Sequence, residues 1–114
     1  MIKKKLLLIQ LNEINFELIK QYSNDIDFKF FNKEFFENLS ITNSEEKYEL
    51  LEPWIQWVSI YTGERAEQHK IFRLGDIRKY KGTSLFNIIE ELNKSVGVVC
   101  SMNLENNLKK PKYF

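Results

Sequence analysis

The chain of 114 residues has few of the residue types that mark particular classes of protein. Its single cysteine, Cys100, excludes an internal disulfide and a cysteine-based zinc site, and it is typical of a reducing compartment. The four glycines form no phosphate-binding loop, and the turn "QLNEIN" has no glycine, which argues against a dinucleotide fingerprint. One histidine and three aspartates are too few ligands for a two-metal hydrolytic centre.

The chain also lacks a charge excess and a long apolar run. Seventeen basic and 16 acidic residues nearly cancel, and no basic face is evident, so we do not expect a nucleic-acid partner. The first apolar run is ended by Gln10, Asn12 and Glu13, without the small-residue cleavage site of a signal peptide. No run approaches the roughly 20 apolar residues of a membrane span. These features predict a cytoplasmic protein with no membrane partner.

The residues that are present favour a packed core. The chain is 43% hydrophobic and 14% aromatic, which suits residues 1–114 as one domain or as the N-terminal part of a larger one. Residues 5–11 form a continuous apolar run, typical of a strand that is buried on both faces, and the valine-rich residues 96–100 form another.

Helical patterns follow the first run and precede the second. "NEINFELIKQY" has apolar residues at helical spacing, and "GTSLFNIIEEL" is a helix capped by Thr83 or Ser84. This order predicts an α/β fold, a mostly parallel sheet with helices on both faces in three αβα layers. We expect residues 6–11 and 96–100 to be parallel neighbours, in a domain that is incomplete.

The segments between these elements give weaker signals. Residues 28–31 are either a short strand or part of a packed loop, and Asn32 is expected to cap a short helix, "KEFFENL". Residues 40–51 predict a loop with a strand fragment.

The stretch "EPWIQWVSIYTGERAEQHKIF" predicts an amphipathic helix. Pro53 suits its first turn, Glu52 favours the positive end of the helix dipole, and Gly63 is a typical left-handed C-cap. The apolar face is expected to pack against the core and consists of Trp54, Trp57, Val58 and Tyr61.

This stretch, together with "LLLIQLNEINFELI", resembles the N-terminal part of the alkaline phosphatase superfamily. The similar branch contains type I phosphodiesterases, nucleotide pyrophosphatases and sulfatases, and the matching residues are Thr62, Gly63, His69 and Ile71. The resemblance implies a metal-dependent hydrolase of phosphoric or sulfuric esters, or a phosphotransferase. The family uses a divalent metal such as zinc, magnesium or manganese.

The chain departs from the family at the positions that carry the chemistry. Asn12 stands where the family has its metal-binding Asp, Glu13 stands where Gly is usual, and Pro53 occupies the position of the nucleophile. An amide oxygen is a poor zinc ligand, and covalent catalysis needs a hydroxyl or thiol. We therefore predict no catalytic residue, no tight metal binding, and a chain that hydrolyses no phosphate ester by itself, as in a truncated protein or a pseudoenzyme.

Several residues stay open as site candidates. Asn12 and Glu13 serve either as turn residues or as a remnant ligand and binding contact, and strand ends are places where ligands collect. Pro53, Trp54 and Gln56 are further binding candidates on the predicted helix. A structural role is expected for Thr62, Gly63 and His69, although His69 also fits an exposed or a functional position.

Two functional hypotheses follow. In the first, the chain is the N-terminal segment of an alkaline-phosphatase-like hydrolase. In the second, it is a non-catalytic α/β module that binds or assembles. Either would leave an exposed sheet edge near residues 95–102, so we expect self-association or a protein partner there.

Overall fold

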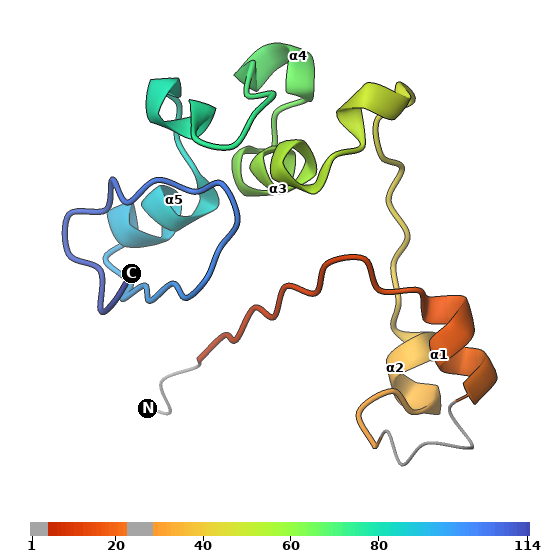
Figure 1. Ribbon diagram of the computed structural model, residues 1–114. Helices are drawn as coiled ribbons and strands as arrows, with labels where there is room; N and C mark the ends of the chain where they lie inside the picture. The colour runs from red at the N-terminus through yellow and green to blue at the C-terminus, as the bar shows by residue number, and fades with distance from the viewer. Residues whose placement is uncertain (1–4, 23–28) are drawn as a thin grey trace. The chain divides into compact units, whose positions relative to one another are not determined.

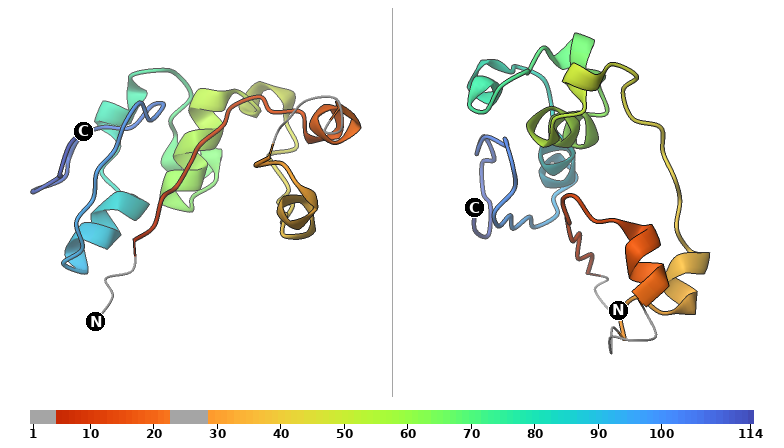
Figure 2. Two further views of the ribbon diagram at one scale, coloured as in Figure 1. Left: turned by 90° about the horizontal axis from the view of Figure 1, so that it is seen from below. Right: turned by 45° about the vertical axis from the view of Figure 1, so that its right-hand side comes forward.

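The computed structural model describes residues 5–22 and 29–114, and the chain divides into two compact units (Figure 1). Residues 1–43 form the first unit, which contains helices α1 (Phe16–Tyr22) and α2 (Lys33–Glu37). Residues 44–114 form the second unit. Its elements are η1 (Tyr48–Leu50), α3 (Pro53–Thr62), α4 (Ala66–His69), η2 (Asp76–Lys79) and α5 (Leu85–Glu91) (Figure 2).

The predicted three-layer αβα fold is wrong. Within the described residues every regular element is a helix, and no strand or sheet is present. Neither residues 6–11 nor residues 96–100 form the predicted strands, and the loop at residues 40–51 contains a turn of 3₁₀ helix, η1, instead of a strand fragment. Of residues 28–31, the first lies outside the described part, and the other three form turns and bends.

The physical reason is that a strand is defined by its neighbour. An apolar run satisfies its backbone only when another segment pairs with it, whereas a helix satisfies its own. Residues 5–11 run into α1 as an extended trace in Figure 1 without belonging to any sheet. Residues 96–98 also belong to no ladder, and the backbone turns to a left-handed conformation soon after them, at Cys100, where φ is 53°.

Each helix of the first unit begins at a side-chain cap. Asn32 Oδ1 accepts from the Phe35 backbone N–H at 2.9 Å, which confirms the predicted cap of α2, and Asn15 Oδ1 accepts from Leu18 N–H at 3.0 Å at the start of α1. The two helices are joined by a cluster of phenylalanines, with ring centroids 5.0–6.0 Å apart, that contains Phe16, Phe30, Phe31, Phe35 and Phe36. No described residue of this unit is buried, so the phenylalanine cluster is partly exposed to solvent and does not form a hydrophobic core.

Helix α3 is the centre of the second unit. Pro53 occupies its first turn, and Gly63 ends it in a left-handed conformation with φ of 72°, donating its N–H to Ser59 O at 2.8 Å. Both features confirm the helix predicted from the sequence. Val58 and Tyr61 of the predicted face are buried, and so is Ile55, which was not predicted. Trp54 and Trp57 are only half-buried.

Two apolar clusters form the core around α3. One joins Leu50, Ile55 and Ala66, with Trp54 packed against it, and the other joins Val58, Ile71 and Ile77, with Tyr80 packed against it. Both clusters use α3 residues, so the later elements of the unit are held together through this helix. Helix α5 contacts α3 through the Phe86 ring, whose centroid lies 5.4 Å from that of Tyr61.

The predicted helix α5 is confirmed, and its cap is Ser84. The Ser84 side chain accepts from the Asn87 backbone N–H, while Asn87 Oδ1 accepts from Ser84 N–H at 2.9 Å, as in a capping box. After α5, Val96 and Val98 are buried, whereas Val99 is 72% exposed. Their backbone bonds to the tail, since Val98 N–H donates to Tyr113 O at 3.0 Å and Lys112 N–H donates to Val96 O at 2.6 Å.

The importance of α3 for stability is testable with two isoleucines of the same helix. Ile55 is 2% exposed and Ile60 is 58% exposed. We expect Ile55→Ala to lower the free energy of unfolding by about 2–5 kcal/mol, because it leaves a cavity between α3 and α4. Ile60→Ala should change it by less than about 0.5 kcal/mol. Urea unfolding followed by circular dichroism measures both, and equal effects would contradict this core.

Candidate functional site

A buried polar contact in the second unit joins α3 to α4. Ser59 Oγ lies 3.0 Å from His69 Nε2, and His69 Nδ1 accepts from the Ile71 backbone N–H at 3.0 Å. His69 is 4% exposed, although it is the only histidine of the chain. A buried histidine beside a serine is the arrangement in which a nucleophile and its base are sought.

The local sequence explains how His69 reaches this position. Thr62 Oγ1 donates to Val58 O at 2.8 Å and accepts from Glu64 N–H at 3.2 Å, which fixes the turn after α3. Glu45 Oε1 then accepts from Ala66 N–H at 3.0 Å at the start of α4. A left-handed residue, Lys70 with φ of 57°, ends α4 directly after the histidine, so the next N–H turns back toward the ring.

The hydrogen bonds of His69 determine its tautomer. Because Nδ1 accepts from a backbone N–H, the neutral ring carries its proton on Nε2. Nε2 therefore donates to Ser59 Oγ, and Ser59 in turn faces the Ile55 carbonyl at 3.5 Å. A general base needs a free lone pair toward the hydroxyl, and here that nitrogen is a donor. The contact fastens α3 to α4 and does not activate Ser59.

Burial also keeps His69 neutral. Desolvation lowers the pKa of His69 below its ordinary value of 6.5, and the carboxylates of Glu64 and Glu45 oppose this effect only in part. Protonation would place a second proton on Nδ1, facing the Ile71 N–H, and would remove that hydrogen bond. The folded unit therefore requires the neutral ring.

This requirement predicts a pH dependence of stability. Since the pKa of His69 is lower in the folded chain than in the unfolded one, the unfolded chain binds more protons at mildly acidic pH. The contribution of neutral His69 to the free energy of unfolding should be fully present above about pH 6.5. It should fall as the pH decreases toward the pKa of His69 in the folded chain. In His69→Gln this step should be absent, although the variant is less stable at neutral pH. Unfolding curves across this range measure it, and an unchanged step in the variant would contradict it.

The other candidates from the sequence fall into two places. Asn12 and Glu13 lie in an exposed bend before α1, where Glu13 has a φ of 55°, so their predicted turn chemistry agrees with the structure. Among the described residues, no group of three or more His, Cys, Asp or Glu side chains is placed to hold a metal ion. A metal-ligand role for Asn12 stays a prediction.

The binding candidates of α3 use their polar atoms within the unit. Trp54 Nε1 donates to Phe72 O at 3.1 Å, and Gln56 Nε2 donates to Leu50 O at 2.7 Å. Pro53 is half-buried at the helix start. None of these three residues lines the cavity beside Val58 and Tyr80, whose volume of about 10 Å³ is room for one water.

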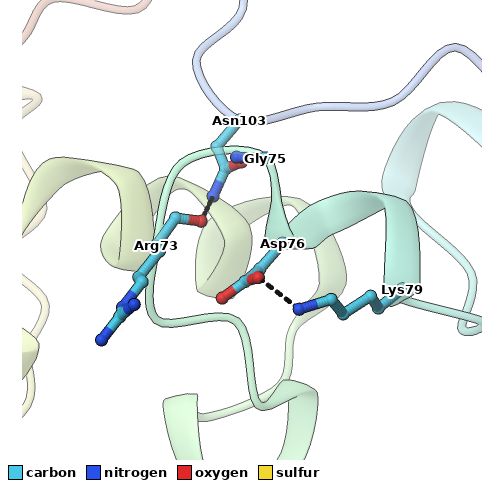
Figure 3. Close-up of polar contacts among 5 residues, drawn as sticks. All are labelled: Arg73, Gly75, Asp76, Lys79 and Asn103. Atoms are coloured by element: carbon cyan, nitrogen blue, oxygen red, sulfur yellow. Dashed lines mark hydrogen bonds and ion pairs between the residues drawn. The ribbon is translucent and has the colours of Figure 1, made fainter.

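Asn103 is a polar anchor that the sequence analysis missed. Its Nδ2 donates to Trp54 O at 2.8 Å and to Arg73 O at 3.3 Å, and its Oδ1 accepts from Gly75 N–H at 3.1 Å (Figure 3). It joins the tail to α3 and to the loop before η2. Beside it, Lys79 Nζ lies 2.8 Å from Asp76 Oδ1, and this contact lowers the pKa of Asp76. An asparagine in a polar tail gives no local sign of partners 30 and 49 positions away.

The anchor can be tested against an asparagine of the same backbone conformation. Asn103 has a φ of 50° and Asn93 has a φ of 57°, so alanine adds similar strain at both positions. Asn103→Ala also removes three hydrogen bonds and should cost about 1–3 kcal/mol more than Asn93→Ala. Thermal and urea unfolding measure the difference, and equal losses would show that the anchor adds nothing.

A second candidate site lies in the first unit, in the apolar segment, defined as residues 6–11. Five aliphatic side chains of this extended segment are at least 49% exposed, namely Leu6, Leu7, Leu8, Ile9 and Leu11, at 87%, 81%, 53%, 57% and 49%. A run of large apolar side chains in water is uncommon outside interaction sites. No helix in the described part of the chain has the length and apolar character needed to cross a bilayer.

Comparison of the chain with protein-family models, with curated proteins and with solved structures found no match. The resemblance to the alkaline phosphatase superfamily therefore stays a prediction, and the two sites above are interpreted from their own geometry.

Proposed function

We propose that the chain is a non-catalytic binding and assembly element, and that its apolar segment adds to a partner protein as a β-strand. The observation that carries this proposal is the exposure of five aliphatic side chains in one extended run. In the proposed complex, the partner removes these side chains from water and satisfies the backbone of the segment.

The free energy gained by burying these five side chains supports a protein partner. The five exposed fractions are equivalent to roughly three fully exposed side chains, and each contributes about 1.5–3 kcal/mol when buried. The total of about 5–10 kcal/mol is similar to the cost of association, about 4–15 kcal/mol. Burial alone therefore gives a weak complex, and strand hydrogen bonds are needed to make it lasting.

The sequence of the segment suits strand addition. It contains neither proline nor glycine, so no residue lacks the N–H that a ladder uses and none has the flexibility of glycine. Successive side chains point to opposite faces, which places Leu7, Ile9 and Leu11 together on one face. In recognition by strand addition, the backbone supplies affinity and the side chains of alternate residues supply specificity.

The rest of the first unit does not cover the segment. No described residue of residues 1–43 is buried, and Phe30 is 60% exposed although it belongs to the phenylalanine cluster. A unit that buries no residue gains little stability from its own packing. The apolar segment and the phenylalanine cluster are thus both surfaces that a partner would complete.

The Ser59–His69 contact supports the non-catalytic part of the proposal. Its donor and acceptor directions fasten two helices and leave the serine without a base. Hydrolysis of phosphoric or sulfuric esters, which the family resemblance implies, would need a nucleophile that neither Ser59 in this arrangement nor Pro53 supplies.

Photo-crosslinking in the cell that makes the protein tests the proposal. A photoreactive phenylalanine at Leu7 should crosslink to a protein, because the partner covers this position. The same residue at Ile41, which is 94% exposed and also apolar, is the matched control and should crosslink much less. Crosslinking to lipid, or equal yields at both positions, would overturn the proposal.

A further inference from the structure

We infer that the partner of the apolar segment is a second copy of this chain, paired antiparallel with Ile9 of each copy opposite the other. This inference rests on the proposed function and names its partner. The pairing uses a two-fold axis through Ile9, which places Leu7 opposite Leu11, Lys5 opposite Glu13, and the reverse on the other side of the axis.

Charge at the two ends of the segment favours this direction. Lys5 precedes the apolar segment and Glu13 follows it, and both side chains are exposed. An antiparallel pair brings Lys5 of each copy to Glu13 of the other, whereas a parallel pair in register brings like charges together. The net charge of +1 also leaves little long-range repulsion between two copies.

The apolar pattern favours the register. With Ile9 opposite Ile9, the face of Leu7, Ile9 and Leu11 meets the same three residues of the second copy, so every pair on that face is apolar. A shift of the axis to Leu8 would place Lys5 opposite Leu11 and would lose both charge pairs. This two-residue change of register is disfavoured by charge and, because Leu11 then faces a lysine, by apolar contact.

The residues around the apolar segment set where the pairing of the two copies ends and what the paired strands pack against. The backbone turns at Glu13, where φ is 55°, so pairing ends there and the Lys5–Glu13 contact lies at the rim. A two-stranded ribbon is marginal in water unless it packs on a helix layer. Helix α1 and the turn before α2 supply apolar surface for that layer, because Phe16 of α1 is 39% exposed and Phe30 of the turn is 60% exposed.

Cysteine crosslinking of the full chain tests direction and register. In a Cys100→Ser background, Ile9→Cys should form a disulfide-linked dimer on mild oxidation, because opposite residues of a strand pair lie about 4.5–5.5 Å apart. Leu6→Cys should not, because its two copies would lie about 20 Å apart along the strands. Crosslinking of both variants would indicate a parallel pair and would overturn the inference, as would crosslinking of neither.

Charge reversal gives an independent readout of the same pair. Lys5→Glu and Glu13→Lys should each weaken the dimer several-fold in light scattering, and the double variant should restore it, because the opposite charges meet again. Failure of the double variant to recover would contradict the register. If the protein is monomeric while Leu7 crosslinks to a different protein in the cell, the second-copy inference fails and the proposed function stands.

Discussion

The second unit depends on the burial of one helix, α3. Val58 is fully buried and touches the cluster that holds Ile71 and Ile77, while Ile55 on the same helix holds the cluster with Leu50 and Ala66. The polar contacts attach to the same helix: His69 reaches Ser59, and the tail reaches the Trp54 carbonyl through Asn103. Helices of four residues such as α4 and η2 are not stable in isolation. They are held by packing against α3.

Local signals in the sequence were sufficient to predict helices α3 and α5 of this unit, although not α4, η1 or η2. Pro53, Gly63 and Ser84 each act on the few residues beside them, and each occupies the helix end that its chemistry favours. The strands were predicted wrongly because a strand needs a neighbouring segment to pair with, and an apolar run carries no information about that neighbour. The anchor at Asn103 escaped prediction for the same reason, since all three of its bonds are to residues far along the chain.

The sequence predicted which stretch contains the candidate site, but not the hydrogen-bond directions that decide its chemistry. The stretch from residue 52 to 72 does contain the polar contact, and both Thr62 and His69 take part in the turn and helix contacts there. What no pattern shows is the direction of each hydrogen bond. The backbone N–H of Ile71 fixes the His69 tautomer, and that bond depends on the left-handed turn at Lys70. A serine beside a histidine is therefore not sufficient for nucleophilic chemistry. When a backbone N–H donates to Nδ1, the ring proton lies on Nε2, and Nε2 cannot accept the proton of the serine.

The two units differ in what their apolar residues accomplish. In residues 44–114 apolar side chains are buried against one another, and the unit has a core to which each later segment adds. In residues 1–43 the apolar side chains are at least as dense in sequence, yet no described residue is buried. Because burial supplies most of the free energy that opposes chain entropy, the partner surface that we propose would supply what the packing of this unit does not. The apolar segment has the strand-forming backbone, the alternating faces and the oppositely charged ends with which a second copy can provide that surface.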